Sequence, residues 1–277
     1  MGKLFLTPGE ITKAWIEIGK KKADLEIGKM LMLGILAGMF IGLGAHADIV
    51  IIQTLGKNID VGLAKFLGAA VFPVGIMLVV IAGAELFTGN CLISLAVMDK
   101  RATLDKMLKN WTVVYAGNLI GSVLLALLLS KSGLYAPEAM SEKALAIASG
   151  KLSLTFTQAV IRGIFCNVLV VLAVWMQAGA KDISGKILAM WFPVMLFVLS
   201  GFEHSVANMY FIPLGKFLGL GISWTQIWIA NLVPVTIGNI IGGAILIPMA
   251  YWYSYAYQKR EMEPKRFGKL VFHNNNS

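Results

Sequence analysis

A carboxylate and an amide recur at the same spacing in two apolar stretches of this chain, and one copy adds a histidine. Both stretches fit Gly-x-Glu-x4-Asn: one runs from Gly83 to Asn90, and the other, 118 positions later, from Gly201 to Asn208. His204 in the second copy can donate a hydrogen bond or a proton to a solute, since an unperturbed imidazole has a pKa of about 6.5. Polar groups in apolar stretches are costly unless they line a cavity or stabilise an interrupted backbone. The two phrases therefore predict paired helix breaks around a solute pathway.

The residues that the copies share are expected to differ in role from those that distinguish them. Glu85 and Glu203 are predicted to accept hydrogen bonds from backbone amides of the interrupted segments and to stay out of the pathway. The predicted scaffold residues are Glu85, Glu203, Asn90, Gly83 and Gly201. The half-helices that start near Thr88 and Ser205 direct about half a positive charge each toward the membrane centre, which attracts a small anion. The functional hypothesis therefore rests on Thr88 and His204, where the copies differ.

Membrane-spanning helices must position these residues. Of the 277 residues, 57% are hydrophobic and only 14% are charged, against about 25% charged residues in an ordinary soluble domain. A span needs about 20 mostly apolar residues. Six runs qualify: residues 30–50, 66–98, 111–130, 155–178, 187–212 and 226–256. The predicted fold is thus an all-α integral membrane protein with six transmembrane helices, of which helices 2 and 5 are broken.

Two further pairs of similar segments accompany the repeated phrases. Tyr115–Ser122 in the third run matches Thr236–Gly243 in the sixth at an offset of 121, and Gly34–Gly38 resembles Gly163–Asn167 at an offset of 129. Three pairs in the same order indicate that the second half of the chain is a diverged copy of the first. Because each copy has an odd number of spans, the copies must lie in opposite membrane orientations, which is a 3+3 inverted repeat.

The domain boundaries and the topology follow from the charge distribution. Residues 1–28 are predicted to form a cytoplasmic amphipathic helix, which is either docked on the membrane surface or solvated. Residues 29–258 form the channel domain, with repeat one at 29–130 and repeat two at 155–258, joined by a loop at 131–150; residues 259–277 form a cytoplasmic tail. Most of the positive charge behind the net +9 lies in the first 29 residues, 100–109, 181–186 and 259–269. By the positive-inside rule both termini are cytoplasmic.

Three stretches resemble the formate/nitrite transporter family: Gly83–Gly89, Cys166–Ala173 and Gly201–Met209. One departure is Val171, where the family pattern usually has a cysteine; the change should alter packing more than transport. The resemblance implies an aquaporin-like fold in a homopentamer of the plasma (inner) membrane, with one pore in each subunit.

The resemblance also implies roles for individual residues. His204 is similar in position to the family's central histidine, Thr88 to the loop threonine that faces it, and Asn167 and Asn208 to the accompanying amides. Leu86 and Phe87 resemble the inner constriction, Phe72 and Phe197 resemble the outer one, and Lys151 resembles a lysine that draws anions into the outer vestibule.

The predicted function is permeation of a small monovalent anion, formate first, with nitrite or hydrosulfide as alternatives. No enzyme activity, cofactor, metal site or nucleic-acid partner is expected; the partners are the anion, the lipid bilayer and further copies of the chain. A rival from another class is a membrane enzyme or the anchor subunit of a redox complex. That rival predicts paired histidines for haem, whereas His204 is the one histidine within a predicted run. Water or glycerol conduction is disfavoured because the Asn-Pro-Ala signature is absent.

Overall fold

The computed structural model describes residues 5–257, whose regular secondary structure is helical apart from one isolated bridge between Phe5 and Ala180. The first half contains α1 Pro8–Ala23, α2 Ile27–Ile52, α3 Leu55–Asn58, α4 Val61–Val71, α5 Val74–Met77, η1 Leu78–Gly83, α6 Phe87–Asn90, α7 Ile93–Met98 and α8 Leu104–Lys131. The second half contains α9 Glu138–Leu152, α10 Phe156–Gly179, α11 Ile183–Leu199, α12 Ser205–Phe217, α13 Trp224–Ile227, η2 Trp228–Leu232, α14 Val233–Ile240, η3 Ile241–Leu246, α15 Ile247–Trp252 and η4 Tyr253–Tyr257. The predicted tail, 259–277, lies outside the described residues.

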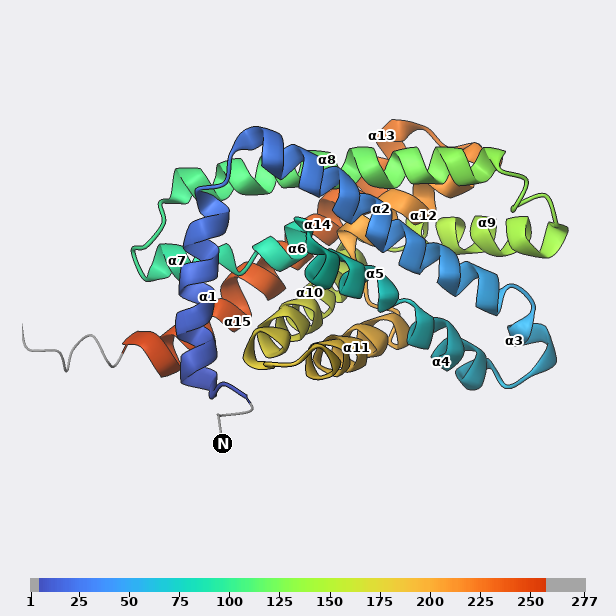
Figure 1. Ribbon diagram of the computed structural model, residues 1–277. Helices are drawn as coiled ribbons and strands as arrows, with labels where there is room; N and C mark the ends of the chain where they lie inside the picture. Colours follow the sequence, from blue (N-terminus) through green and yellow to red (C-terminus); the bar gives the residue numbers. More distant parts are fainter. Residues whose placement is uncertain (1–4, 258–277) are drawn as a thin grey trace, which may run out of the picture.

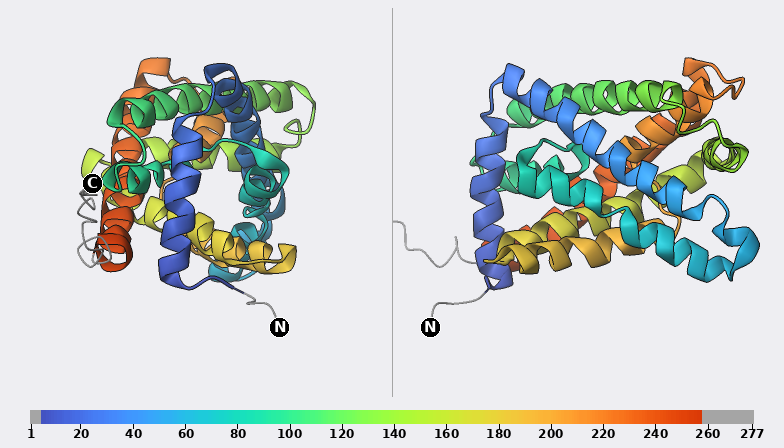
Figure 2. Two further views of the ribbon diagram at one scale, coloured as in Figure 1. Left: turned by 60° about the vertical axis from the view of Figure 1, so that its left-hand side comes forward. Right: turned by 45° about the vertical axis from the view of Figure 1, so that its right-hand side comes forward.

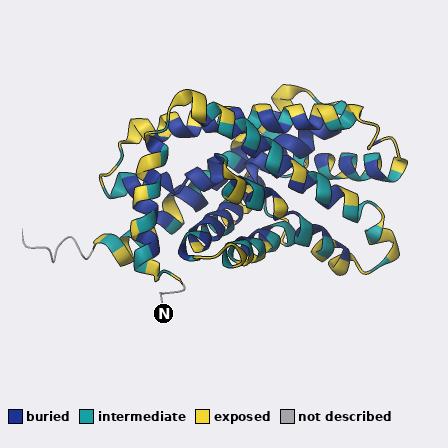
Figure 3. Cartoon of the chain, in the orientation of Figure 1, coloured by how far each residue is buried: buried dark blue, intermediate teal, exposed yellow. Residues whose placement is uncertain are grey.

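Within residues 5–257, five helical stretches are long and apolar enough to cross a membrane, and two shorter apolar helices lie beside them (Figure 1). The five are Ile27–Asn58, Val61–Gly83, Leu104–Lys131, Phe156–Gly179 and Trp224–Tyr257, and the shorter two are Phe87–Met98 and Ile183–Leu199. The outward sides of these helices carry exposed apolar side chains (Figure 3), for example Phe192 and Ile229. Such a surface is suited to contact with lipid rather than with water.

The second and fifth predicted runs are interrupted where the repeated phrases lie. Gly83, the last residue of η1, has φ +90°. Gly201, in the turn that follows the end of α11 at Leu199, has φ +70°. Glycine takes this left-handed conformation without the steric cost that other residues meet. The glycine of each phrase therefore ends one half-helix, and the next begins at α6 or α12.

Two helix pairs pack so closely that their contact points require glycine. Helix α2 packs on α8, and α10 packs on α14 and on η3, which continues α14. A Cβ at Gly121 would collide with the carbonyl of Ile35, and a Cβ at Gly242 would collide with the carbonyl of Ile164. The two collisions are equivalent, because the glycines are 121 positions apart and the isoleucines 129.

Helix α1 lies across one end of the bundle, with an apolar face against the protein (Figure 2). It ends at Ala23 rather than near residue 28, and its start is fixed by a capping box between Thr7 and Glu10. The Trp15 side chain is buried, and its Nε1 donates to the carbonyl of Val174 at 3.2 Å. This packing favours docking on the protein over a solvated helix.

The segment predicted as a loop at 131–150 contains a helix, so that prediction was wrong. Gly133, with φ +84°, follows the end of α8. Pro137 directly precedes α9. Alanine-rich Glu138–Leu152 has a glutamate in its first turn and a lysine in its last, as the helix dipole favours. Pro8 of α1 and Pro137 before α9 lie 129 positions apart, so α9 is the counterpart of α1.

The corner between α1 and α2 should respond to acid. Asp24 accepts a hydrogen bond from Lys106 Nζ at 2.6 Å, and this bond lowers the pKa of Asp24 below its ordinary value. A lowered carboxyl pKa adds stability above the unfolded-state pKa and loses it as the pH falls through the folded-state pKa. We expect Lys106→Gln to lower the thermal midpoint slightly at pH 7, and the wild type and the variant to converge below about pH 4. A constant difference down to pH 3 would contradict this.

Candidate functional site

The two helix breaks meet at a hydrogen bond between Thr88 and His204. Thr88 Oγ1 lies 2.8 Å from His204 Nε2. The other ring nitrogen, Nδ1, accepts the backbone N–H of Ala207 at 3.0 Å at the start of α12. A backbone N–H can only donate, so Nδ1 carries no proton, and the neutral ring bears its proton on Nε2. His204 therefore presents an N–H donor toward Thr88.

Behind His204, a closed ring of polar side chains holds the second break. Glu203 accepts from Lys151 Nζ at 3.1 and 3.2 Å and from Asn208 Nδ2 at 2.6 Å. Asn208 also donates to Asn231 Oδ1 at 2.7 Å, and Asn231 donates to the carbonyl of Lys151 at 2.9 Å. The buried carboxylate is thus paired with a lysine and hydrogen-bonded, which is what a charge at this depth requires.

The first break has the same ring. Glu85 accepts from Lys22 Nζ at 2.6 Å and from Asn90 Nδ2 at 2.7 Å. Asn90 donates to Asn110 Oδ1 at 2.9 Å, and Asn110 donates to the carbonyl of Lys22 at 2.9 Å. Matching members of the two rings lie at constant distances along the sequence: 129 positions for the lysines, 118 for the glutamates and asparagines of the repeated phrases, and 121 for Asn110 and Asn231. The hydrogen bonds thus reproduce the three sequence offsets.

Sequence reasoning missed Lys22, Asn110 and Asn231. The signal was present, since Lys22 precedes Lys151 by the offset of 129 and the two asparagines differ by 121. Lys22 falls within the predicted amphipathic helix, and Lys151 falls between the predicted loop at 131–150 and repeat two at 155–258, so both lie outside the predicted repeat boundaries. The matching hydrogen bonds therefore include residues of α1 and α9.

A third asparagine in each copy binds the backbone of the break. Asn118 accepts from the N–H of Phe87 at 2.9 Å and donates to the carbonyls of Gly34 and Glu85 at 2.8 and 2.9 Å. Asn239 accepts from the N–H of Ser205 at 2.9 Å and donates to the carbonyls of Gly163 and Glu203 at 2.8 and 3.0 Å. This corrects the role predicted for Glu85 and Glu203: asparagine side chains satisfy the broken backbone, and the glutamate side chains bind lysine and asparagine.

The amides predicted for the pathway, Asn167 and Asn208, make hydrogen bonds at the second break. Asn208 is buried in the ring around Glu203. Asn167 donates to the carbonyl of Asn239 at 2.7 Å and fills the space that Gly243 leaves open. Neither asparagine lines the cavities described below. Both asparagines bind groups at the second break, and their contact with the solute stays a prediction.

Two cavities of similar size face each other across the breaks. The Lys151 cavity, about 510 Å³, is lined by Lys151, Glu203 and His204, with Asp48, Lys65, Phe72, Lys143, Arg162 and Phe197 among the others. The Lys22 cavity, about 500 Å³, is lined by Lys22, Glu85 and Leu86, with Trp15, Ile76, Asn90 and Gln177 among the others. Between them lies a chamber of about 10 Å³, lined by Ile41, Phe72, Ile76, Leu86, Val170, Val194, Phe197 and His204. Every lining residue of the chamber except His204 is apolar.

Aromatic and aliphatic side chains close both sides of the chamber. Phe72 and Phe197 meet edge to face with ring centroids 5.6 Å apart, and the His204 ring stacks on Phe197 at 5.7 Å. These three side chains border both the Lys151 cavity and the chamber. Leu86 and Ile76 border both the chamber and the Lys22 cavity. The chamber therefore connects to one cavity past an aromatic constriction and to the other past an aliphatic one.

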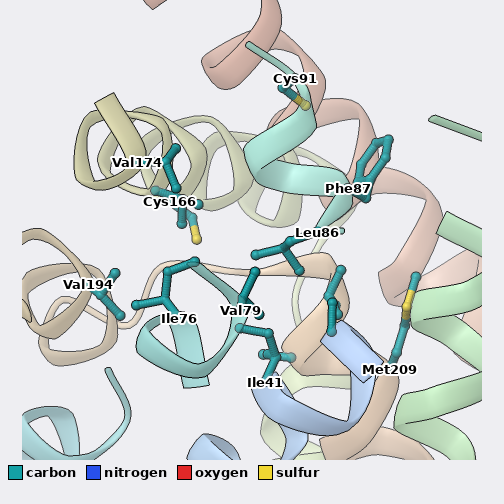
Figure 4. Packing of buried hydrophobic residues seen from close by; sticks show 14 of the residues in the cluster. Ile41, Ile76, Val79, Leu86, Phe87, Cys91, Cys166, Val174, Val194 and Met209 are labelled. Carbon is teal, nitrogen blue, oxygen red and sulfur yellow. The ribbon is translucent and has the colours of Figure 1, made fainter. Parts of the chain in front are cut away.

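Phe87 is not part of this lining, contrary to the sequence-based expectation. Leu86 and Phe87 point to different sides (Figure 4). The Phe87 ring packs edge-on against Tyr115 at 4.9 Å and against Trp111 at 6.0 Å. The backbone at Leu86 is extended, and in extended chain successive side chains point to opposite sides. Leu86 therefore borders both the chamber and the Lys22 cavity, whereas Phe87 borders neither.

Comparison with known proteins places this arrangement in a family. Residues 9–253 match the formate/nitrite transporter family. The chain is 44% identical over 272 residues to a probable formate transporter of Methanothermobacter thermautotrophicus, covering 92% of this chain and 99% of the relative. It is 38% identical over 270 residues to the formate channel FocA of Escherichia coli strain K12, covering 90% and 94%.

A solved pentameric formate channel with formate bound has the same fold, with a TM-score of 0.76 at 35% identity, over 83% of this chain and 97% of that one. The resemblance found in the sequence is therefore confirmed, and with it a multi-pass membrane protein with an all-helical fold. The chain belongs to the formate/nitrite transporter family.

Proposed function

We propose that this chain is a channel for small monovalent anions, with formate as the first candidate, and that each subunit contains its own pore. The observation that carries the proposal is the pair of similar cavities separated by an apolar chamber whose one polar lining residue is His204. Relatives named as formate channels and transporters support the choice of formate. Nitrite and hydrosulfide are the alternative solutes within the same family.

The path runs from the Lys151 cavity past Phe72 and Phe197 into the chamber, and past Leu86 into the Lys22 cavity. Between the apolar side chains an anion loses most of its water, which is costly unless hydrogen bonds replace it. The Nε2–H of His204 is the donor nearest the chamber, and a small anion can accept its hydrogen bond when Thr88 gives it up. The excess positive charge of Lys65, Lys143 and Arg162 attracts the anion to the Lys151 cavity.

The topology and the assembly belong to the same proposal. The duplicated hydrogen-bond rings support two copies of a three-span unit in opposite orientations, with six crossings in total. The charge distribution supports cytoplasmic termini in the plasma membrane, so that the Lys22 cavity opens inward and the Lys151 cavity outward. A homopentamer is proposed from the pentameric relative. Nothing in the proposed pathway requires a chemical reaction, so transport is the activity to measure.

Uptake of labelled formate into proteoliposomes tests the function, and Leu86 tests the path. We expect wild-type protein to carry formate well above empty liposomes while excluding acetate. Leu86→Ala removes the aliphatic constriction, so the ratio of acetate to formate flux should rise several-fold. Phe87→Leu is the matched control: it changes the neighbouring apolar side chain, which packs on Tyr115 and Trp111, and should leave the ratio unchanged.

Three outcomes would contradict parts of the proposal. Wild-type flux of nitrite or hydrosulfide without flux of formate would overturn the choice of solute. Absence of flux for all three anions would overturn the channel. An altered ratio in Phe87→Leu with none in Leu86→Ala would move the constriction from one residue to the other.

A further inference from the structure

Asp48 is a buried acidic residue that lines the cavity proposed to receive anions. It lies on α2 and is 9% exposed. Its carboxylate packs directly against Gly68 of α4, where a Cβ would collide with Oδ1. Among the described residues, none donates a hydrogen bond to this carboxylate or forms an ion pair with it. Lys143 and Lys151 act on it at longer range.

The charges around Asp48 all belong to the same cavity. Four cationic side chains line it: Lys65, Lys143, Lys151 and Arg162. Glu203 is the other acid there, and it is paired with Lys151 at 3.1 Å. Of the two acids that line this cavity, Asp48 is therefore the one without a close cation. Its negative charge offsets part of the positive potential that would otherwise hold an anion strongly.

The opposite cavity supplies an internal comparison. At the offset of 129, the counterpart of Asp48 is Gln177. Gln177 is also 9% exposed, and it lines the Lys22 cavity. That cavity has one cationic lining residue, Lys22, and Glu85 pairs with it. The same position is therefore a neutral amide in the Lys22 cavity, where Lys186 Nζ donates to its Oε1 at 3.2 Å, and an acid without a close cation in the Lys151 cavity.

We propose that Asp48 sets the strength of anion capture in the Lys151 cavity, an inference that rests on the proposed channel function. A permeation site must attract an ion enough to admit it and yet hold it weakly enough to release it. Beside the Lys151–Glu203 pair, three further cations line the cavity, and without Asp48 they would favour capture at the expense of release. The charge of Asp48 weakens capture, so it determines the concentration range over which the channel works.

Asp48→Asn tests this, because the side chain keeps its size while the charge is removed. We expect the KM for formate uptake through this cavity to fall about fivefold, with little increase in the maximum rate, as expected for one charge acting over a short distance in a partly solvated cavity. Glu142→Gln is the matched control, since it removes an equal charge from an exposed side chain of α9 that lies outside the cavity lining. Lys143→Gln should shift KM in the opposite direction.

Salt dependence separates a charge effect from a packing effect. The difference in KM between wild type and Asp48→Asn should shrink when a salt with an impermeant anion is raised from 0.01 to 0.5 M, because screening shortens the range of the field. A KM equal to that of wild type, or a shift that is the same at both salt concentrations, would overturn the inference while wild-type flux leaves the channel function intact. If wild type carries nitrite or hydrosulfide instead of formate, the same comparison uses that anion. If wild type carries none of the three, the channel function fails and this inference fails with it.

Discussion

Replacement of Asn239 by leucine is expected to lower the free energy of unfolding by about 4 kcal/mol. The side chain is fully buried and makes three hydrogen bonds to backbone groups. Two of those groups, the N–H of Ser205 and the carbonyl of Glu203, lie at the break, where helical partners are lacking. A buried backbone group left without a partner costs about 1–3 kcal/mol. The change can be measured by unfolding in mixed detergent and SDS micelles.

The internal repeat provides a second test of the same prediction. Asn118→Leu should have a comparable effect, because Asn118 makes the matching three hydrogen bonds in the first break. Asn58→Leu is the control: Asn58 is exposed at the end of α3 and donates to the carbonyl of Thr54 alone, so the change should be within about 0.5 kcal/mol. If the Asn239→Leu protein were as stable as the Asn58→Leu protein, the hydrogen bonds of Asn239 would not be what stabilises the helix break.

His204→Phe is expected to reduce formate flux about 10- to 100-fold. Phenylalanine keeps a flat ring that can stack on Phe197, so the apolar constriction is largely preserved. The variant lacks the Nε2–H donor, and a hydrogen bond to a charged group contributes about 1.5–3 kcal/mol, which corresponds to that range of rates. Initial rates of labelled formate uptake measure the effect.

Protein stability must be separated from transport in this variant. The N–H of Ala207 loses its acceptor at the start of α12, which should cost about 1 kcal/mol. Thr88→Val serves as the comparison, because it removes the partner of Nε2 while leaving the donor in place, and its flux should fall less. Unchanged flux in a correctly assembled His204→Phe protein would exclude His204 both as hydrogen-bond donor and as proton donor.

The architecture was predictable because the breaks leave signs in the chain itself. Glycine at Gly83 and Gly201 is required by a positive φ, and the carboxylates stand out against their apolar surroundings. The offsets of 118, 121 and 129 anticipated the duplicated hydrogen-bond rings. Helix α9 escaped prediction because Gly133 and Pro137 suggested a loop, although they end one helix and start the next.

The composition of the constriction could not be predicted in the same way. Leu86 and Phe87 are adjacent and both apolar, and lipid, protein interior and chamber wall all accept apolar side chains. Hydrophobicity therefore gave no basis for choosing between them. The extended backbone at Leu86 directs one side chain into the chamber and the other toward Tyr115 and Trp111.

By itself, the sequence determined the membrane-spanning class, the two breaks, the matched spacing of their polar residues and the family, since these depend on periodicity, composition and local conformation. The tertiary structure alone decided which groups pair: Lys22 with Glu85, asparagines with the broken backbone, and Asp48 with a cationic cavity. These partners lie far apart in the sequence, and a buried charge or an open backbone group specifies only that a partner must exist. The packing of α1, α2, α9 and α14 around the breaks selects which residue that partner is.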